Sequence, residues 1–163
     1  MTNFPLHAIG PVDGRYFSKT KELTHFFSEA SLMRYRVKVE VEYFISLCEL
    51  PLPQLMDVNK NIFSTLRDYY LNFSDEDANK IKEIESVTNH DVKAVEYFIK
   101  DKMEAQGLGP AKEFVHFGLT SQDINNTAIP MSLKDSMEQI HIPYLEKLIL
   151  QLTDFSNLWK DVS

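Results

Sequence analysis

The stretch RVKVEVE at residues 36–42 decides the fold class, because it fits two structures. Charged residues alternate with valines along it, and a period of two with β-branched residues is typical of a strand. A wider set of apolar residues instead follows the spacing of a helix: Leu32, Tyr35, Val39, Tyr43 and Leu47. No hairpin turn follows the stretch, and no other segment offers it a strand partner. We therefore predict a helix here and an all-α fold.

The segments before this stretch are a predicted loop and the start of the same helix. Residues 4–18 contain two prolines and two glycines, which predicts an ordered loop or short turns. The helical pattern begins at Thr20, breaks near Ser28 and continues to Leu50, before the prolines of the sequence PLP at 51–53.

Two further helices are predicted in the middle of the chain. Residues 61–73 place aromatic and aliphatic side chains at helical spacing, and we expect these side chains to form core. Ser74, followed three residues later by Asp77, predicts the start of the next helix, because a serine side chain can accept a hydrogen bond from a free backbone N–H group of the first turn.

A long helix is predicted for the last part of the chain. Thr120 or Ser121 caps it, and it runs to Asp161. Pro130 and Pro143 lie inside this span, and each removes one backbone hydrogen bond, so we expect a bend or a local break at both. An apolar stripe reaches the last residues and predicts an element that continues beyond them, as in a truncated protein: Leu145, Leu148, Leu152, Phe155 and Trp159.

Composition limits the classes of function. With 163 residues, 44% of them hydrophobic, the chain can hold a core, and its net charge of −7 argues against a general nucleic-acid or membrane-surface binder. Cys48 has no partner for an internal disulfide, and we expect it to be a packing residue. No apolar run is long enough to span a bilayer, so a cytoplasmic location is predicted.

Arg15 and Tyr16 directly follow the turn signal Asp13-Gly14. An arginine beside a phenol at a glycine turn can bind a phosphate through charge-assisted hydrogen bonds. The alternative is a surface turn with a solvated arginine, because most turns are exposed. These residues alone leave both interpretations open.

The sequence Thr88-Asn89-His90-Asp91 opens a further predicted helix. Thr88 or Asn89 can cap it, which would place His90 in the first turn. The positive end of the helix dipole disfavours a charged imidazole there, so we expect a neutral His90 that makes one hydrogen bond. That bond can serve a ligand or the structure alone.

The segment EFVHFGLTSQDINN at residues 113–126 joins an apolar run containing His116 to a dense cluster of polar side chains. The cluster has more hydrogen-bonding capacity than a turn requires. It therefore predicts a functional site near Thr120 and Ser121.

Three motifs together resemble the adenylosuccinate lyase family of the fumarase/aspartase superfamily, nearest to its bacterial purine-biosynthesis form. They are PVDGRY at 11–16, TNHDVKAVEYF at 88–98 and the segment at 113–126. The resemblance implies an all-α fold. It implies an N-terminal helical domain with a substrate-binding loop at residues 1–110, and the truncated start of the central helical bundle at 111–163.

The resemblance also implies roles for matching residues. The nucleotide phosphate is expected at Arg15 and Tyr16, and a carboxylate of the succinyl group at Thr120 and Ser121. His116 matches a family active-site histidine. In the second motif, the resemblance implies substrate contacts at Asn89, His90 and Asp91, with His90 orienting the substrate. Lys93 is a weaker candidate, for charge balance.

The implied reaction is the β-elimination of fumarate from adenylosuccinate, giving AMP, and from the succinyl-carboxamide intermediate of purine biosynthesis. The resemblance implies no metal or organic cofactor, and a homotetramer with shared sites. The family's Thr-His-Gly-Gln segment with the general acid, and the serine loop with the general base, do not occur in this sequence. We therefore expect an N-terminal piece that is inactive alone.

Two alternatives stay open. A helical protein-interaction module would explain composition and periodicity, with the polar cluster serving only as caps and turns. Another superfamily lyase, such as argininosuccinate lyase or fumarase, is the other alternative. The Arg15-Tyr16 pair argues against these lyases, because their substrates carry no phosphate.

Overall fold

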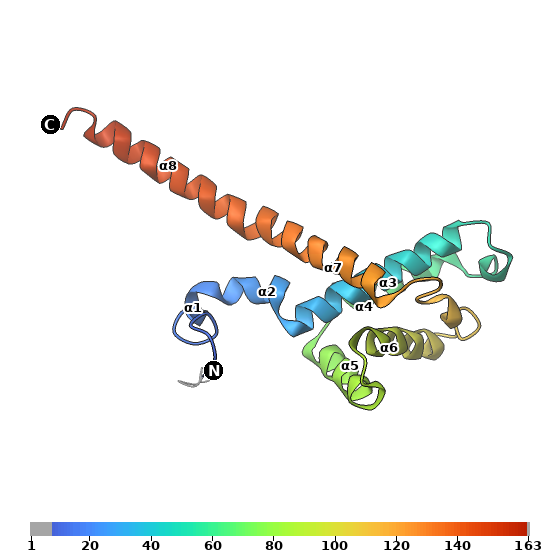
Figure 1. The fold of residues 1–163 in the computed structure, drawn as a ribbon. Coiled ribbons are helices and arrows are strands. Elements are labelled where there is room, and N and C mark those ends of the chain that lie inside the picture. The colour runs from blue at the N-terminus through green and yellow to red at the C-terminus, as the bar shows by residue number, and fades with distance from the viewer. Residues whose placement is uncertain (1–7, 163) are drawn as a thin grey trace. The chain divides into compact units, whose positions relative to one another are not determined.

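The computed structural model describes residues 8–162. All secondary-structure elements assigned within that range are helices, which confirms the predicted all-α fold (Figure 1). The α-helices are α1 Phe17–Thr20, α2 Thr24–Phe27, α3 Glu29–Glu49, α4 Phe63–Leu71, α5 Asp75–Thr88, α6 Asp91–Ala105, α7 Ser121–Ser136 and α8 Ile142–Trp159. Short 3-10 turns are η1 Lys21–Leu23, η2 Pro53–Leu55, η3 Lys60–Ile62 and η4 Lys112–Phe114, and η5 Met137–His141 is π-helical.

The chain divides into two compact units. One is Glu29–Met131, and the other combines Met1–Ser28 with Ser132–Ser163. We describe each unit by itself. The division at residue 110 expected from the family resemblance stays a prediction.

The core of the Glu29–Met131 unit is built on α3, which packs against α4, α5 and α6. Val37 and Val41 are fully buried one helical turn apart, and so the stretch at 36–42 is helical, as predicted. Its strand-like alternation has a physical reason: the buried face also includes Arg36 and Glu40, which are 7% and 0% exposed. Because charged residues also lie on the inner face of this core helix, charged and apolar residues alternate in its sequence as they would in a strand.

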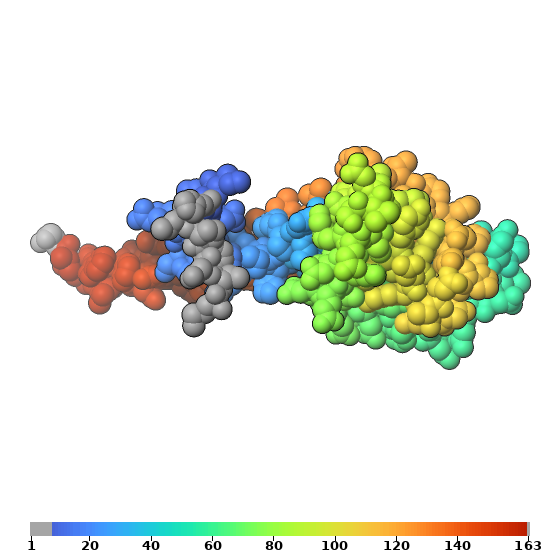
Figure 2. Space-filling view, turned by 90° about the horizontal axis from the view of Figure 1, so that it is seen from below, coloured from blue at the N-terminus to red at the C-terminus, as the bar shows by residue number. Residues whose placement is uncertain are grey.

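The helices around α3 follow their predicted patterns. Tyr69 and Tyr70 of α4 are buried in the core, as expected for an aromatic stripe. Ser74 and Asp77 form a reciprocal capping box at the start of α5. α5 and α6 lie side by side on one face of this unit (Figure 2). Cys48 is a buried free thiol, which confirms its packing role.

The predicted cap of α6, Thr88 or Asn89, is wrong by one or two residues. Asn89 adopts a left-handed conformation with φ 51° and ends α5, while His90 itself is the N-cap of α6. Asparagine tolerates this conformation better than most residues, which lets one residue turn the chain between two helices. His90 therefore precedes the first turn instead of lying inside it.

The loop predicted near the N-terminus ends two residues earlier than expected. Residues 8–16 form bends and turns, but Phe17 and Ser18 already belong to α1, and the predicted loop at residues 4–7 lies outside the described residues. The expected break falls at Ser28, whose extended ψ of 161° separates α2 from α3.

The last helix is interrupted once. The local break expected at Pro130 is wrong, because α7 continues through this residue. At the second proline, the π-helical segment η5 directly precedes α8, with Pro143 in the first turn of α8. Pro143 cannot donate a backbone hydrogen bond, so a local change of helix type here agrees with the predicted break. α8 ends at Trp159, two residues before the predicted Asp161, and its apolar stripe is exposed. No described helix is long and apolar enough to cross a membrane.

Candidate functional site

Two of the three sequence motifs meet where α6 and α7 begin. The hydroxyl oxygen of Ser121, the first residue of α7, lies 3.5 Å from Nε2 of His90, the N-cap of α6. The two residues are 31 positions apart in the sequence. The first N–H groups of a helix lack partners within it, and the helix dipole adds positive potential at that end. Two such ends side by side favour an anionic ligand.

His90 presents one defined nitrogen. Its Nδ1 accepts a hydrogen bond of 3.1 Å from the backbone N–H of Lys93, which completes the helix cap. An accepting Nδ1 carries no proton, so the proton of the neutral ring is on Nε2, which faces Ser121. Half of the side chain is exposed, at 51%. His90 can therefore donate one hydrogen bond to a ligand while it caps α6.

Thr120 and Ser121 are engaged differently. The Thr120 hydroxyl donates to Asp123 Oδ2 at 2.7 Å, and the backbone N–H of Thr120 donates to the same oxygen at 2.7 Å. These hydrogen bonds lower the pKa of Asp123 below its ordinary value. The Thr120 hydroxyl hydrogen thus belongs to the cap of α7, and the Ser121 hydroxyl is the one directed at His90.

Arg36 joins both helix starts to α3, and sequence reasoning missed it. Its Nη2 donates to Asp91 Oδ2 at 2.7 Å, and its Nε donates to Asn125 Oδ1 at 3.0 Å. Partial burial alone would raise the pKa of Asp91, but the Val92 N–H and the Arg36 guanidinium together lower it. The sequence does contain a sign of this role, since Arg36 is a charged residue on the apolar face of a predicted helix. The strand-like alternation of charges at residues 36–42 makes that sign hard to recognise.

His116 lies in the turn between η4 and α7. Its backbone has φ 63°, and its Nδ1 is 2.5 Å from Oε1 of Glu40 on α3. Its side chain is 16% exposed, and that of Glu40 is fully buried. Sequence reasoning found His116 but not Glu40, because its contact with Glu40 spans 76 positions in the sequence.

Lys93 is not a free cation, because its ammonium group is paired within the chain. Its Nζ lies 2.7 Å from Oε2 of Glu96, and the ammonium sits 5.3 Å from the centre of the Tyr97 ring. Lys100 binds the other oxygen of Glu96 at 3.0 Å. The two lysines balance a buried carboxylate, and the predicted link between Lys93 and the substrate stays a prediction.

Arg15 and Tyr16 belong to the other compact unit. The Arg15 guanidinium carbon lies 5.4 Å from the centre of the Tyr16 ring, a cation–π distance, and Tyr16 is 48% exposed. The guanidinium therefore lies beside the Tyr16 ring in an exposed turn. Their predicted binding of a phosphate stays a prediction.

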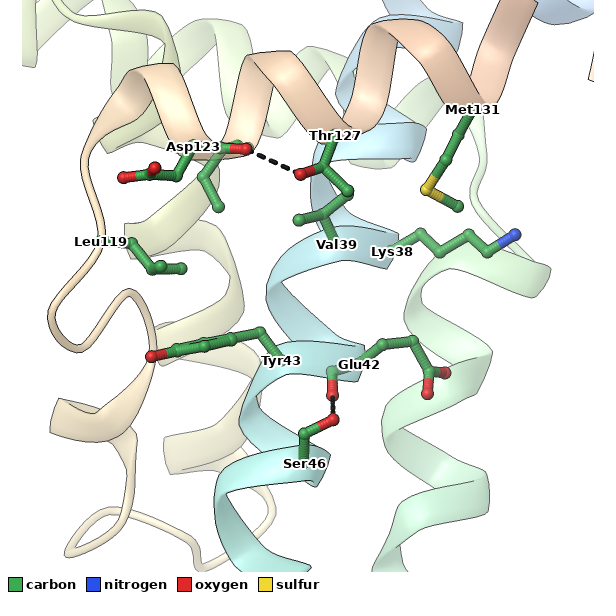
Figure 3. Close-up of a pocket in the computed structure, with 10 residues that line it drawn as sticks. Lys38, Val39, Glu42, Tyr43, Ser46, Leu119, Asp123, Thr127 and Met131 are labelled. Carbon is green, nitrogen blue, oxygen red and sulfur yellow. Dashed lines mark hydrogen bonds between the residues drawn. The ribbon is translucent and has the colours of Figure 1, made fainter. Parts of the chain in front are cut away.

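A hollow of about 300 Å³ lies between α3 and α7 (Figure 3). The Thr127 hydroxyl in it donates to the backbone carbonyl of Asp123, and the Tyr43 hydroxyl donates to the carbonyl of Phe117 at 2.9 Å. Its walls are mostly apolar. Neither His90 nor Ser121 lines it, so we do not assign the substrate to it.

Comparisons with known proteins agree with the motifs. The chain is 54% identical over 162 residues to an adenylosuccinate lyase of Dictyostelium discoideum, a match that covers 96% of this chain. It is 40% identical to those of Legionella pneumophila (strain Corby) and Escherichia coli (strain K12), over 100% and 96% of this chain. The chain spans about 35% of the length of these relatives, at 35%, 36% and 35% respectively.

These similarities confirm the resemblance that the three motifs indicated. The family model described as lyase matches residues 14–163, nearly the whole chain. The chain therefore belongs to the lyase family.

Proposed function

We propose that this chain is the N-terminal part of an adenylosuccinate lyase and supplies one wall of its substrate site. The reaction is the β-elimination of fumarate from adenylosuccinate and from the succinyl-carboxamide purine intermediate. The similarity to three adenylosuccinate lyases supports this proposal. The substrate would be a purine nucleotide with an anionic succinyl group.

The approach of Ser121 to His90 is the observation that carries the proposal. A carboxylate placed there would meet the Ser121 hydroxyl, the Nε2–H of His90 and the N-terminal end of α7. These donors can also stabilise the negative charge that develops when a proton leaves the carbon next to a carboxylate. Arg36 holds the wall together without facing outward, because it is 7% exposed.

The remaining roles follow the family resemblance. Arg15 and Tyr16 hold the phosphate, Asn89 and Asp91 contact the substrate, and His116 is an active-site histidine. The general acid and base come from other parts of the enzyme, and the full enzyme is a homotetramer. On this proposal, the chain alone binds ligands weakly and does not release fumarate.

Binding is tested by NMR titration of the ¹⁵N-labelled chain with succinate and with AMP. We expect succinate to shift the backbone signals of Ser121 and His90, and AMP to shift those of Arg15 and Tyr16. Ser121→Ala should reduce the succinate shifts, whereas Thr127→Ala should not. Thr127 is the matched control because its hydroxyl is on the same helix and donates to the Asp123 carbonyl at 2.8 Å.

Two outcomes would contradict the proposal. If succinate and AMP at millimolar concentration leave all these signals unchanged, the chain is better explained as a protein-interaction module. If the chain alone releases fumarate from adenylosuccinate, measured by ultraviolet absorbance, the acid and base are present in it after all.

A further inference from the structure

Glu40 is a carboxylate that the proposed reaction does not use. It lies in the middle of α3, its side chain is fully buried, and Oε1 is 2.5 Å from Nδ1 of His116. Its other oxygen, Oε2, is buried and has no hydrogen-bond partner among the described residues. Burial raises the pKa of Glu40, and the hydrogen bond from His116 partly offsets that effect. Such a group is costly to bury, and the imidazole is the partner that offsets the cost.

His116 is held in an unusual backbone conformation. Its φ of 63° is left-handed, a region that a histidine seldom adopts outside turns, and its carbonyl accepts from the Leu119 N–H at 3.2 Å. A glycine would adopt this φ without strain. The ring contact with Glu40 gives a reason for a histidine at this position, because the turn directs the imidazole at α3.

The other charges near the pair already have partners. Glu96 is close enough to raise the pKa of Glu40, and it is bound by Lys93 and Lys100. Arg36, one turn before Glu40 on α3, is bound to Asp91. Asp123 is close enough to His116 for the imidazole to lower its pKa, and it accepts from Thr120. The hydrogen bond with His116 is thus the side-chain contact that balances Glu40 among the described residues.

We propose that Glu40 is a positioning residue for His116: its carboxylate accepts the Nδ1–H of the ring, which fixes the imidazole and leaves Nε2 as the nitrogen available to a ligand. The consequence for substrate binding rests on the proposed function, while the fixed ring does not. His90 and His116 are then held in opposite tautomers, since His90 is fixed through an accepting Nδ1.

The ring nitrogens of ¹⁵N-histidine-labelled chain test this directly, with His116→Gln to assign the signals. In the unsubstituted chain we expect the neutral His116 ring to be protonated at Nδ1. Glu40→Gln should weaken this preference for the Nδ1–H tautomer, because a neutral amide oxygen is a weaker acceptor than a carboxylate. Glu40→Asp keeps the charge, so its preference should lie between those of the unsubstituted chain and Glu40→Gln.

Glu42→Gln is the matched control, because Glu42 is also on α3 but binds Arg67 at 2.8 and 2.9 Å. It should leave His116 unchanged. A neutral His116 ring protonated at Nε2 in the unsubstituted chain, or an unchanged tautomer preference in folded Glu40→Gln, would overturn the proposal. The tautomer of His116 in the unsubstituted chain needs no variant, so it tests the proposal even if Glu40→Gln fails to fold. Neither readout needs a ligand, so a failure of nucleotide binding would be distinguishable.

Discussion

Arg36 donates from Nη2 to Asp91 at 2.7 Å, and the two residues are 55 positions apart in the sequence. The same guanidinium donates to Asn125 of α7, so one buried side chain fixes the starts of α6 and α7 relative to α3. The meeting of Ser121 and His90 depends on that arrangement. Arg36 thus links the core of this unit to the candidate site.

Replacing Arg36 by leucine should lower the free energy of unfolding. The variant leaves the Asp91 carboxylate and the Asn125 amide without their partner, and losing a hydrogen bond to a charged group costs roughly 1–3 kcal/mol. Urea unfolding followed by circular dichroism measures the change. Arg67→Leu is the control: Arg67 also binds a carboxylate, but its side chain is 41% exposed, so a smaller loss is expected. Equal losses would mean that burial of Arg36 is irrelevant.

Asp91 should make stability depend on pH. Its pKa is lowered in the folded state, so it contributes stability above its ordinary pKa, and that contribution is lost as pH falls through the lowered value. Asp91→Asn should therefore be less stable than the unsubstituted chain at pH 7, and the difference should shrink below about pH 4. Urea midpoints at pH 7 and pH 3 measure it. A difference that is constant with pH would exclude this linkage.

The helices were predictable from the sequence because local patterns determine them. Apolar spacing identified α3, α4 and α6, and the Ser74 cap identified the start of α5. Arg36 and Glu40 were missed as site residues, because their partners depend on which helices pack together. The cap of α6 is His90 and not the predicted Thr88 or Asn89, since the sequence does not show that an imidazole nitrogen would replace the usual oxygen acceptor.

Ser74→Ala should lower the free energy of unfolding by about 1 kcal/mol, the usual cost of losing a helix cap. Ser74 Oγ accepts from the Asp77 N–H at 3.2 Å, and the Ser74 N–H donates to Asp77 Oδ2 at 3.0 Å. Ser86→Ala is a suitable comparison on the same helix, because its hydroxyl only donates to the carbonyl of Glu83. Thermal unfolding of both variants measures the difference. A cost for Ser86→Ala as large as that for Ser74→Ala would count against the capping role.

Cys48 should react slowly with thiol reagents. It is 7% exposed, and burial raises its pKa to about 11, so very little thiolate is present at pH 8. We expect labelling by a disulfide reagent to be much slower in the folded chain than in urea. Labelling at the same rate in both conditions would show that this end of α3 opens readily.

Asn89 allows its structural role and its proposed ligand role to be separated. Its φ of 51° suits asparagine and glycine, whereas a β-branched residue is strained there. Asn89→Gly should therefore keep the free energy of unfolding within about 0.5 kcal/mol, while Asn89→Val should lose on the order of 1–2 kcal/mol. Urea unfolding measures both. If the Asn89 side chain also contacts the nucleotide, Asn89→Gly should weaken AMP-induced NMR shifts in a fully folded chain. Unchanged AMP shifts in Asn89→Gly would restrict this residue to turning the chain between α5 and α6.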